Sequence, residues 1–272
     1  MSTGLKLEWR VWAQSLALLA RSPLYILVLA AIAGLWGWAG YAWLGLPESS
    51  GLVLLLALLW ILALAALLIA ALAGTVASVY AAASEPRGHL SLRRVLSFAR
   101  FGITALFVLA ALVGIYLLAA LFGWINGLAL SVASFLTFHS QQAVSYKLIG
   151  EILWVAEALI WVMATGALMK WMILVSSPRP PAAASVSTRV AQSYWMTLAT
   201  GILAAGVFGG SAWLLATWRP LVTPGAWDYA QLLVRNILAL LLLTLGWLFW
   251  ALSLARITVA RPKEPEASPP PS

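Results

Sequence analysis

Six long runs of apolar residues divide this chain, and they constrain its fold more than any other feature. A helix that spans a bilayer needs about 20 mostly apolar residues, and each run reaches that length. Lipid offers no hydrogen-bond partner to the backbone, and no run alternates apolar and polar residues as barrel strands do, so we expect helices. The sequence predicts an all-α integral membrane protein with six transmembrane helices. The runs cover about residues 22–47, 49–84, 101–127, 148–175, 194–218 and 236–255.

The composition agrees with a place in the membrane and excludes several kinds of site. Hydrophobic residues make up 63% of the chain and charged residues 9%, whereas roughly a quarter of an ordinary soluble domain is charged. The chain has no Cys, which excludes disulfides, thiolate metal sites, iron–sulfur ligation and a Cys nucleophile. Its two His residues, His89 and His139, are too few for a His-rich metal site. We therefore expect no cofactor and no metal.

The N-terminal sequence "MSTGLKLEWRVWAQ" does not have the pattern of a cleaved secretion signal. Lys6, Glu8 and Arg10 come before any long apolar run, and no small-residue cleavage site follows a short apolar core. We expect the first apolar run to remain in the mature protein.

Lys and Arg are distributed unequally between the two sides that six spans create. Only Lys147, Arg219 and Arg235 fall on the side of the first, third and fifth loops. The excess on the other side predicts that both termini are cytoplasmic. Anionic headgroups of the cytoplasmic leaflet then account for the net charge of +8, without nucleic acid as a partner. The cytoplasmic set is Lys6, Arg10, Arg21, Arg87, Arg93, Arg94, Arg100, Lys170, Arg179, Arg189, Arg256, Arg261 and Lys263.

The C-terminal residues 260–272 differ in character from the rest of the chain. They read "ARPKEPEASPPPS", which is polar and rich in proline. Such a segment cannot bury enough apolar area to fold. We expect a disordered cytoplasmic tail after a single six-helix transmembrane domain over residues 1–259.

A basic, amphipathic segment precedes each outgoing span. In "LSLRRVLSFAR", Arg93, Arg94 and Arg100 lie on one helical face, and Leu92 and Val95 lie on the other. Such a helix lies in the headgroup plane with its cations in water. The segments "LKLEWRVWAQSLALLAR" and "SVSTRVAQ" hold the same place before the first and fifth spans. The pattern predicts cytoplasmic juxtamembrane amphipathic helices.

Matching positions in the chain indicate an internal repeat. The spacing from Gly74 to Pro86 equals the spacing from Gly166 to Pro178. One interpretation is a threefold pseudo-repeat of helix pairs in parallel orientation, unlike the inverted repeats of many transporters. The other is that membrane proteins commonly carry prolines and basic segments where spans end. Both interpretations remain open.

Three stretches of the chain resemble a known family. They are "LARSPLYILVLAAIAGL", "EPRGHLSLRRVLSFARFGITALFVL" and "VSTRVAQSYWMTLATGIL". Together they resemble bacterial six-span membrane proteins of the YciC type, and also the membrane domain found beside some glycerophosphodiester phosphodiesterases. The resemblance covers most of the chain and implies a multi-pass protein of the bacterial inner membrane. These families have no agreed catalytic residues, so it implies no catalytic site.

The fourth span carries an acidic residue in its apolar interior. Glu157 lies six residues after Glu151, roughly 9 Å deeper in the membrane at 1.5 Å per residue. A carboxylate at that depth must be neutral, hydrated or paired. Arg235 lies at a similar depth on the sixth span, so we expect a Glu157–Arg235 pair supported by Asn236. The alternative is that Glu157 is a proton or cation site.

The segment between the third and fourth spans is the longest predicted outer connection. Its apolar part, residues 128–138, is too short to span, and we expect an interfacial or re-entrant helix there. Polar residues follow it and form the candidate outer contact loop. They are His139, Gln141, Gln142, Tyr146 and Lys147.

A run of small residues, "GILAAGVFGGSA", lies within the fifth span. Gly201, Gly206, Gly209 and Gly210 belong to it. Small side chains let helix backbones approach closely in membranes. We expect close packing here, within the bundle or against another subunit.

No catalytic motif is present at usable spacing: the sequence has no Ser–His–Asp set, HExxH, Walker A or GxGxxG. We therefore expect a non-enzymatic subunit or scaffold of a larger membrane complex, with other membrane subunits as partners. The alternative is a permease-like transport subunit, working with a cytoplasmic ATPase, with Glu157 at an ion or substrate site. A third hypothesis, which the residues favour least, is a lipid-modifying enzyme that uses His139, Glu151 and Asp228.

Overall fold

The computed structural model describes residues 3–45, 50–85, 88–94, 101–127, 129–140, 145–175, 194–218 and 226–259, and over these ranges it contains helices but no strand. The α-helices are α1 (Thr3–Ala20), α2 (Pro23–Leu44), α3 (Gly51–Ser84), α4 (Phe101–Gly127), α5 (Ala129–Ser140), α6 (Tyr146–Val175), α8 (Tyr194–Leu203), α9 (Gly210–Thr217) and α10 (Ala226–Val259). A 3₁₀ turn, η1 (Leu92–Arg94), and a π-helix, η2 (Ala204–Gly209), complete the set.

Six of the described helical segments are long and apolar enough to cross a membrane. This confirms the predicted all-α class and the six membrane-crossing helices, and it identifies a multi-pass membrane protein. The third segment runs through both α4 and α5. The segments are Pro23–Leu44, Gly51–Ser84, Gly102–Ser140, Tyr146–Val175, Tyr194–Thr217 and Asp228–Val259.

Local sequence signals explain where several helices begin. Pro23 occupies the first turn of α2, where its missing N–H costs nothing and its fixed φ suits a helix. Ser50 caps α3, because its side-chain oxygen accepts a hydrogen bond from the backbone N–H of Val53 at 3.4 Å. Capping satisfies one of the backbone donors that the first helical turn leaves without a partner.

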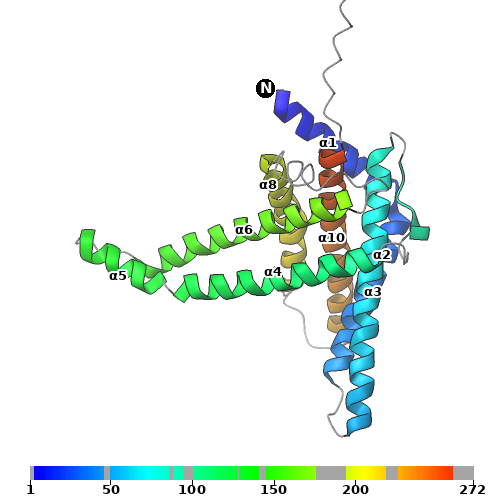
Figure 1. The fold of residues 1–272 in the computed structure, drawn as a ribbon, viewed down its shortest axis with the longest axis horizontal. Helices are drawn as coiled ribbons and strands as arrows, with labels where there is room; N and C mark the ends of the chain where they lie inside the picture. Colours follow the sequence, from blue (N-terminus) through cyan, green and yellow to red (C-terminus); the bar gives the residue numbers. More distant parts are fainter. Residues whose placement is uncertain are drawn as a thin grey trace, which may run out of the picture.

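The helices form hairpins that share one base and then diverge. Figure 1 shows α2 and α3 running side by side down the molecule, whereas α4 and α6 run together across it, with α5 at the far end. The long helix α10 contacts α2, α3, α6, α8 and α9. The N-terminal helix α1 packs against α10 at the base of the hairpins (Figure 1).

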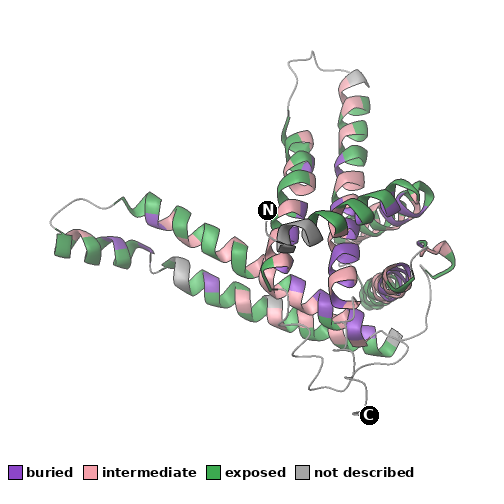
Figure 2. Ribbon diagram, turned by 90° about the horizontal axis from the view of Figure 1, so that it is seen from above, coloured by how far each residue is buried: buried purple, intermediate pink, exposed green. Residues whose placement is uncertain are grey.

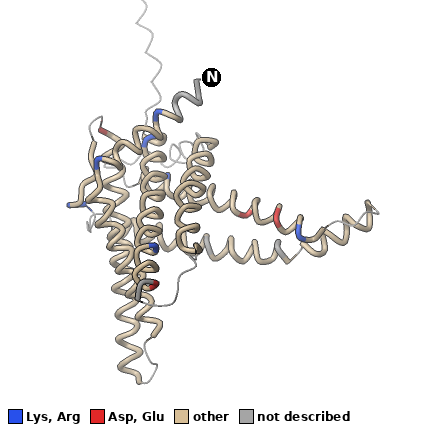
Figure 3. Tube along the Cα trace, turned by 180° about the vertical axis from the view of Figure 1, so that it is seen from behind, with Lys and Arg blue, Asp and Glu red and all other residues tan. Residues whose placement is uncertain are grey.

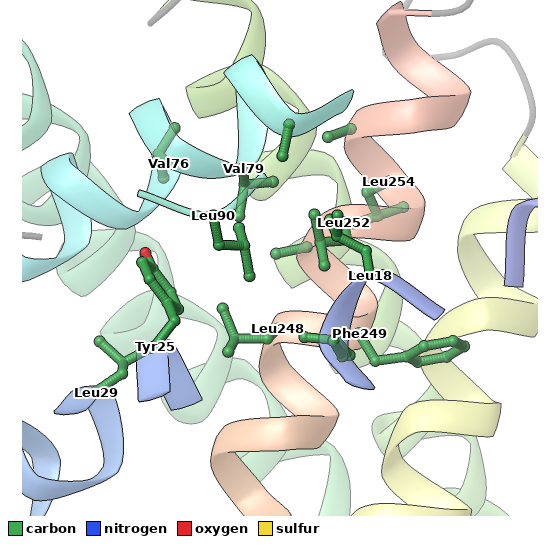
Figure 4. Close-up of a cluster of buried hydrophobic side chains, with 14 of the residues drawn as sticks. Leu18, Tyr25, Leu29, Val76, Val79, Leu90, Leu248, Phe249, Leu252 and Leu254 are labelled. Carbon is green, nitrogen blue, oxygen red and sulfur yellow. The ribbon is translucent and has the colours of Figure 1, made fainter. Parts of the chain in front are cut away.

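The main hydrophobic core lies at this shared base. Leu248, Leu252 and Leu254 of α10 are fully buried, and Figure 4 shows them close to Leu18 of α1 and Val79 of α3. Leu252 and Leu254 are two residues apart and therefore lie on nearly opposite faces of α10, so this helix contacts its neighbours on more than one side. The C-terminal half of α10 is therefore the centre of the bundle.

Burial falls away from the base toward the far ends of the hairpins, as Figure 2 shows. Leu106, Leu109, Val113 and Tyr116 of α4 are all exposed and recur at helical spacing along one face. Large exposed apolar faces mark contact with lipid or with another protein. The outer part of the α4–α6 hairpin can therefore contact either lipid or another protein.

The far end of the α4–α6 hairpin has a small apolar cluster of its own. Ala129 and Ala133 of α5 pack with Ile149 and Leu153 of α6. The apolar segment that is too short to span thus forms a helix, α5, that lies against α6. This cluster joins the two arms of the hairpin at the end distant from the core.

The fifth span is interrupted by the π-helix η2, within the run of small residues. A Cβ on Gly201 would lie 2.4 Å from Val162, so close packing is confirmed at that glycine. Gly206, Gly209 and Gly210 instead face open space. Among these four glycines, Gly201 is therefore the one in close contact with α6, just before η2.

Several sequence predictions lie outside the described residues. These are the contact-loop residues Gln141 and Gln142, the cation Arg100 and the tail over 260–272. Of the basic segment before the third span, the structure describes the turn η1, in which Arg93 and Arg94 are exposed.

Candidate functional site

Polar side chains are buried at the base where the hairpins meet, and we call this group the polar hub. Each member is at most 2% exposed. A buried polar group is costly unless it finds a hydrogen-bond partner. Such a concentration in an otherwise apolar chain makes the hub the first candidate for a functional site. The hub comprises Ser15, Tyr25, Thr75, Ser78, Lys170, Thr197, Thr200 and Ser253.

Three hydrogen bonds between side chains fasten α1 to the hub. The indole N–H of Trp12 donates to Thr200 Oγ1 of α8 at 3.0 Å. The hydroxyl of Ser253, from α10, lies 3.2 Å from that of Ser15. Arg256 of α10 also donates to Gln14 Oε1 at 2.6 Å. The N-terminal helix is therefore held against two transmembrane helices by polar contacts as well as by apolar packing.

Removal of the contact between Trp12 and Thr200 should loosen α1. In the variant Trp12→Phe, Thr200 remains buried without its indole donor, which costs about 1 kcal/mol. We expect faster amide hydrogen exchange in α1, measured by mass spectrometry on the purified protein. Trp9→Phe is the control, because Trp9 is 69% exposed and lies on the same helix. Equal exchange in the two variants would contradict the assignment.

The second part of the hub holds the segment that follows α3 against α3 itself. The backbone N–H of Ser91 donates to Ser78 Oγ at 2.8 Å. The hydroxyl of Tyr25 lies beside those of Thr75 and Ser78 without a hydrogen bond of normal geometry. At Gly88 a Cβ would lie 2.4 Å from the carbonyl oxygen of Ala82, so only glycine lets the chain turn back this closely.

Lys170 is the buried cation of the hub, at 1% exposure near the end of α6. It lies one turn after Gly166, and residues four apart share a helical face. Gly166 is in close contact with Thr197 of α8 and with the ring of Trp250 of α10. Lys170 therefore points into the contact between α6 and the last two spans. The sequence placed Lys170 among the cytoplasmic cations, and its position as a single Lys near the end of an apolar run was the signal for a buried role.

Glu157 lies farther out on α6, on the face that meets α4 and α5. Its neighbours one turn away are Leu153, which joins the small cluster, and Trp161, whose ring lies 6.3 Å from that of Phe122 in α4. The indole N–H of Trp161 donates to Glu157 Oε1 at 3.4 Å. The carboxylate is half-buried inside the α4–α6 hairpin.

Arg235 lies on α10 and has a different neighbour. Its guanidinium donates to the carbonyl oxygen of Trp218, at the end of α9. A cation at the C-terminal end of a helix also complements the helix dipole. The neighbouring Asn236 is exposed. These contacts of Glu157 and Arg235 involve different helices, and the pairing of the two residues stays a prediction.

The described part of the predicted outer contact loop lies at the far end of the α4–α6 hairpin. His139 ends α5, where its ring lies 4.1 Å from that of Phe135 and Nδ1 lies 3.1 Å from the Phe135 carbonyl oxygen. Tyr146 and Lys147 begin α6 and are exposed. These three side chains are available to a partner or to water.

The contacts described for these side chains join one helix to another. Among the described residues, no set of three His, Asp or Glu side chains is placed to hold a metal ion. In comparisons with protein-family models, with curated proteins and with solved structures, the chain shows no match.

Proposed function

We propose that this protein is a non-enzymatic multi-pass subunit or scaffold of a larger complex in the bacterial inner membrane. The observation that carries the proposal is the divergence of the α2–α3 and α4–α6 hairpins from their common base (Figure 1). The resemblance to six-span proteins of the YciC type, which are bacterial inner-membrane proteins, is the basis for proposing this membrane.

Divergent hairpins leave apolar faces that the chain itself does not cover. On α4, Leu106 is 68% and Leu109 is 61% exposed, and on α3, Leu58 is 54% exposed. Between transmembrane helices there is no hydrophobic driving force, so close packing of side chains holds them together. Helices of another subunit, seated between the two hairpins, would supply the packing that this chain lacks.

The hub supports a structural role at the base of the hairpins. The hydroxyl of Thr200 accepts a hydrogen bond from Trp12, and that of Thr75 donates to the carbonyl of Ala71 at 2.7 Å. These groups are engaged in holding helices rather than arranged around a substrate. A rigid base that carries divergent arms is the arrangement expected of a scaffold.

The proposed orientation places the hub end, both termini and the tail in the cytoplasm. The distribution in Figure 3, where Lys and Arg gather around the end that carries α1, supports it. Exposed Arg10, Arg93 and Arg94 would then meet anionic headgroups. The three hairpins, α2–α3, α4–α6 and α8–α10, support a parallel threefold repeat, because each begins and ends at the hub.

Cysteine labelling tests the orientation, because the natural chain has no Cys. We expect a membrane-impermeant maleimide to label Tyr146→Cys in spheroplasts. Arg94→Cys should react only after the membrane is opened. Both parent residues are exposed, so accessibility within the protein is matched. The reverse pattern of labelling would contradict the proposed orientation.

Purification from native membranes tests the proposed function. We expect the full chain, in mild detergent, to co-purify with the same membrane subunits in repeated preparations. The double variant Leu106→Ala and Leu109→Ala should lose most of them. The control is Leu214→Ala with Leu233→Ala, where the parent residues are similarly exposed, at 60% and 62%. A wild-type chain that purifies alone, in a single-protein micelle, would overturn the proposal.

A permease-like transport subunit is the second candidate, and α6 is the reason to keep it. This helix carries the half-buried Glu157 and the buried Lys170, and charged residues inside membrane helices commonly mark ion or substrate pathways. Transport predicts that Glu157→Gln abolishes substrate uptake into vesicles while the protein stays folded, and that a cytoplasmic ATPase co-purifies. Unchanged uptake in that variant would remove Glu157 from this role.

A further inference from the structure

A narrow apolar slot lies between α2, α3 and α10, on the side of the hub that faces the outer parts of these helices. Its volume is about 270 Å³. It is lined by residues 29–36 of α2, 68–75 of α3 and 240–247 of α10. Seven residue steps on each of three helices make the slot about 10 Å long, at 1.5 Å per residue.

The slot is too small to hold a partner helix. A 10 Å length of helix with its side chains, about 10–12 Å across, occupies roughly 800–1,100 Å³, which is several times the volume of the slot, about 270 Å³. A single hydrocarbon chain is thinner than a helix and is the smaller apolar occupant that the surroundings offer.

The lining is mostly apolar, and three of the polar side chains within it have hydrogen-bond partners. The hydroxyls of Thr75 and Thr244 donate to the carbonyls of Ala71 and Leu240, one turn earlier on their own helices. The indole N–H of Trp36 donates to the Leu64 carbonyl at 3.0 Å and fixes this ring at the outer end of the slot. A cavity with such a lining favours apolar ligands over water.

The slot lies at the depth of lipid acyl chains. Leu29 lies six residues after Pro23, where α2 begins, and Trp36 lies thirteen residues after it. The slot therefore runs from roughly 9 Å to roughly 20 Å along α2 from the hub end. A hydrocarbon core about 30 Å thick has its midplane within that interval. The slot therefore straddles the midplane, at the depth that the inner parts of lipid acyl chains occupy.

We propose that this slot is a binding site for one acyl chain of a phospholipid of the surrounding bilayer. All three walls belong to membrane-crossing helices, so the medium that reaches the slot is hydrocarbon. Lipid is as apolar as the lining, so the gain comes from dispersion contacts that an empty slot would forfeit. The bound chain acts as a filler that joins the α2–α3 hairpin to α10.

Photo-crosslinking in proteoliposomes tests the site. The probe is a phosphatidylglycerol with a diazirine in the middle of one acyl chain, and labelled peptides of the full chain are mapped by mass spectrometry. We expect labels to concentrate on residues 68–75 and 240–247. Ala33→Phe, which fills the slot from α2, should reduce them severalfold. Ala31→Phe should leave them unchanged, because Ala31 is exposed on the same helix but is not part of the lining.

A second variant guards against misfolding. Leu243→Trp fills the slot from α10, where Leu243 is 52% exposed, and it should reduce labelling on residues 68–75. Labels spread evenly over exposed residues of α2, α3 and α4 would overturn the site. So would labelling that Ala33→Phe and Leu243→Trp both leave unchanged. If native mass spectrometry instead finds a bound molecule other than a phospholipid, and the same variants lose it, the proposal of a phospholipid chain is wrong.

Discussion

Leu252→Ala is expected to lower the free energy of unfolding by about 2 kcal/mol or more. Leu252 is 0% exposed and belongs to the core cluster where α10 meets α1 and α3. Truncation leaves a cavity that surrounding side chains fill only in part. The expected loss lies at the low end of the range for soluble cores, because leucine gains little by transfer out of lipid. Unfolding by a denaturing detergent, followed by tryptophan fluorescence, measures the difference.

Leu233→Ala provides the matched control on the same helix. Leu233 is 62% exposed, and substitutions at exposed sites usually change stability by no more than about 0.5 kcal/mol. A large loss for Leu252 and a small one for Leu233 would place the core at the C-terminal half of α10. Equal losses would contradict the position of the core.

Gly201→Leu is expected to have the second large effect, because it separates α6 from α8. A Cβ on Gly201 would lie 2.4 Å from Val162 of α6 and 3.3 Å from the ring of Trp250. Overpacking by one or more groups costs about 1–3 kcal/mol, and leucine adds three carbons beyond the Cβ. We expect a lower melting temperature and a smaller yield of monodisperse protein.

Gly206→Leu is the control for this substitution. Gly206 lies in the same span, one turn or so later, and a Cβ there would meet nothing within 4 Å. The variant should keep the melting temperature of the natural protein. A similar loss in both variants would mean that leucine disturbs the span by itself, and that the α6–α8 contact at Gly201 is not as close as described.

The existence of the six helices was predictable from the sequence, because hydropathy over about 20 residues is a local property. The short helix α5 was also predictable, because residues 128–138 are apolar but too few to span a membrane. The π-helix η2 was not predictable, because the run "GILAAGVFGGSA" fits an α-helix equally well. The choice between an α-helix and a π-helix depends on packing against α10.

Most of the candidate site depends on contacts between segments distant in the sequence. Ser15 and Ser253 are far apart in the chain and ordinary in their local context, and only the fold brings them within 3.2 Å. Lys170 carried a signal, as the single cation near the end of an apolar run, but its burial depends on the close approach of Thr197 to Gly166. The divergence of the hairpins has no local signal at all.

The most direct test of the proposed scaffold role is photo-crosslinking in living cells. A photoreactive amino acid replaces Leu109 on α4, Leu58 on α3 or, as a control, Trp213 on α9, where all three parent residues are more than half exposed. Our account predicts that Leu109 and Leu58 crosslink to the same membrane protein and that Trp213 does not. Adducts to lipid alone from both Leu109 and Leu58 would contradict it.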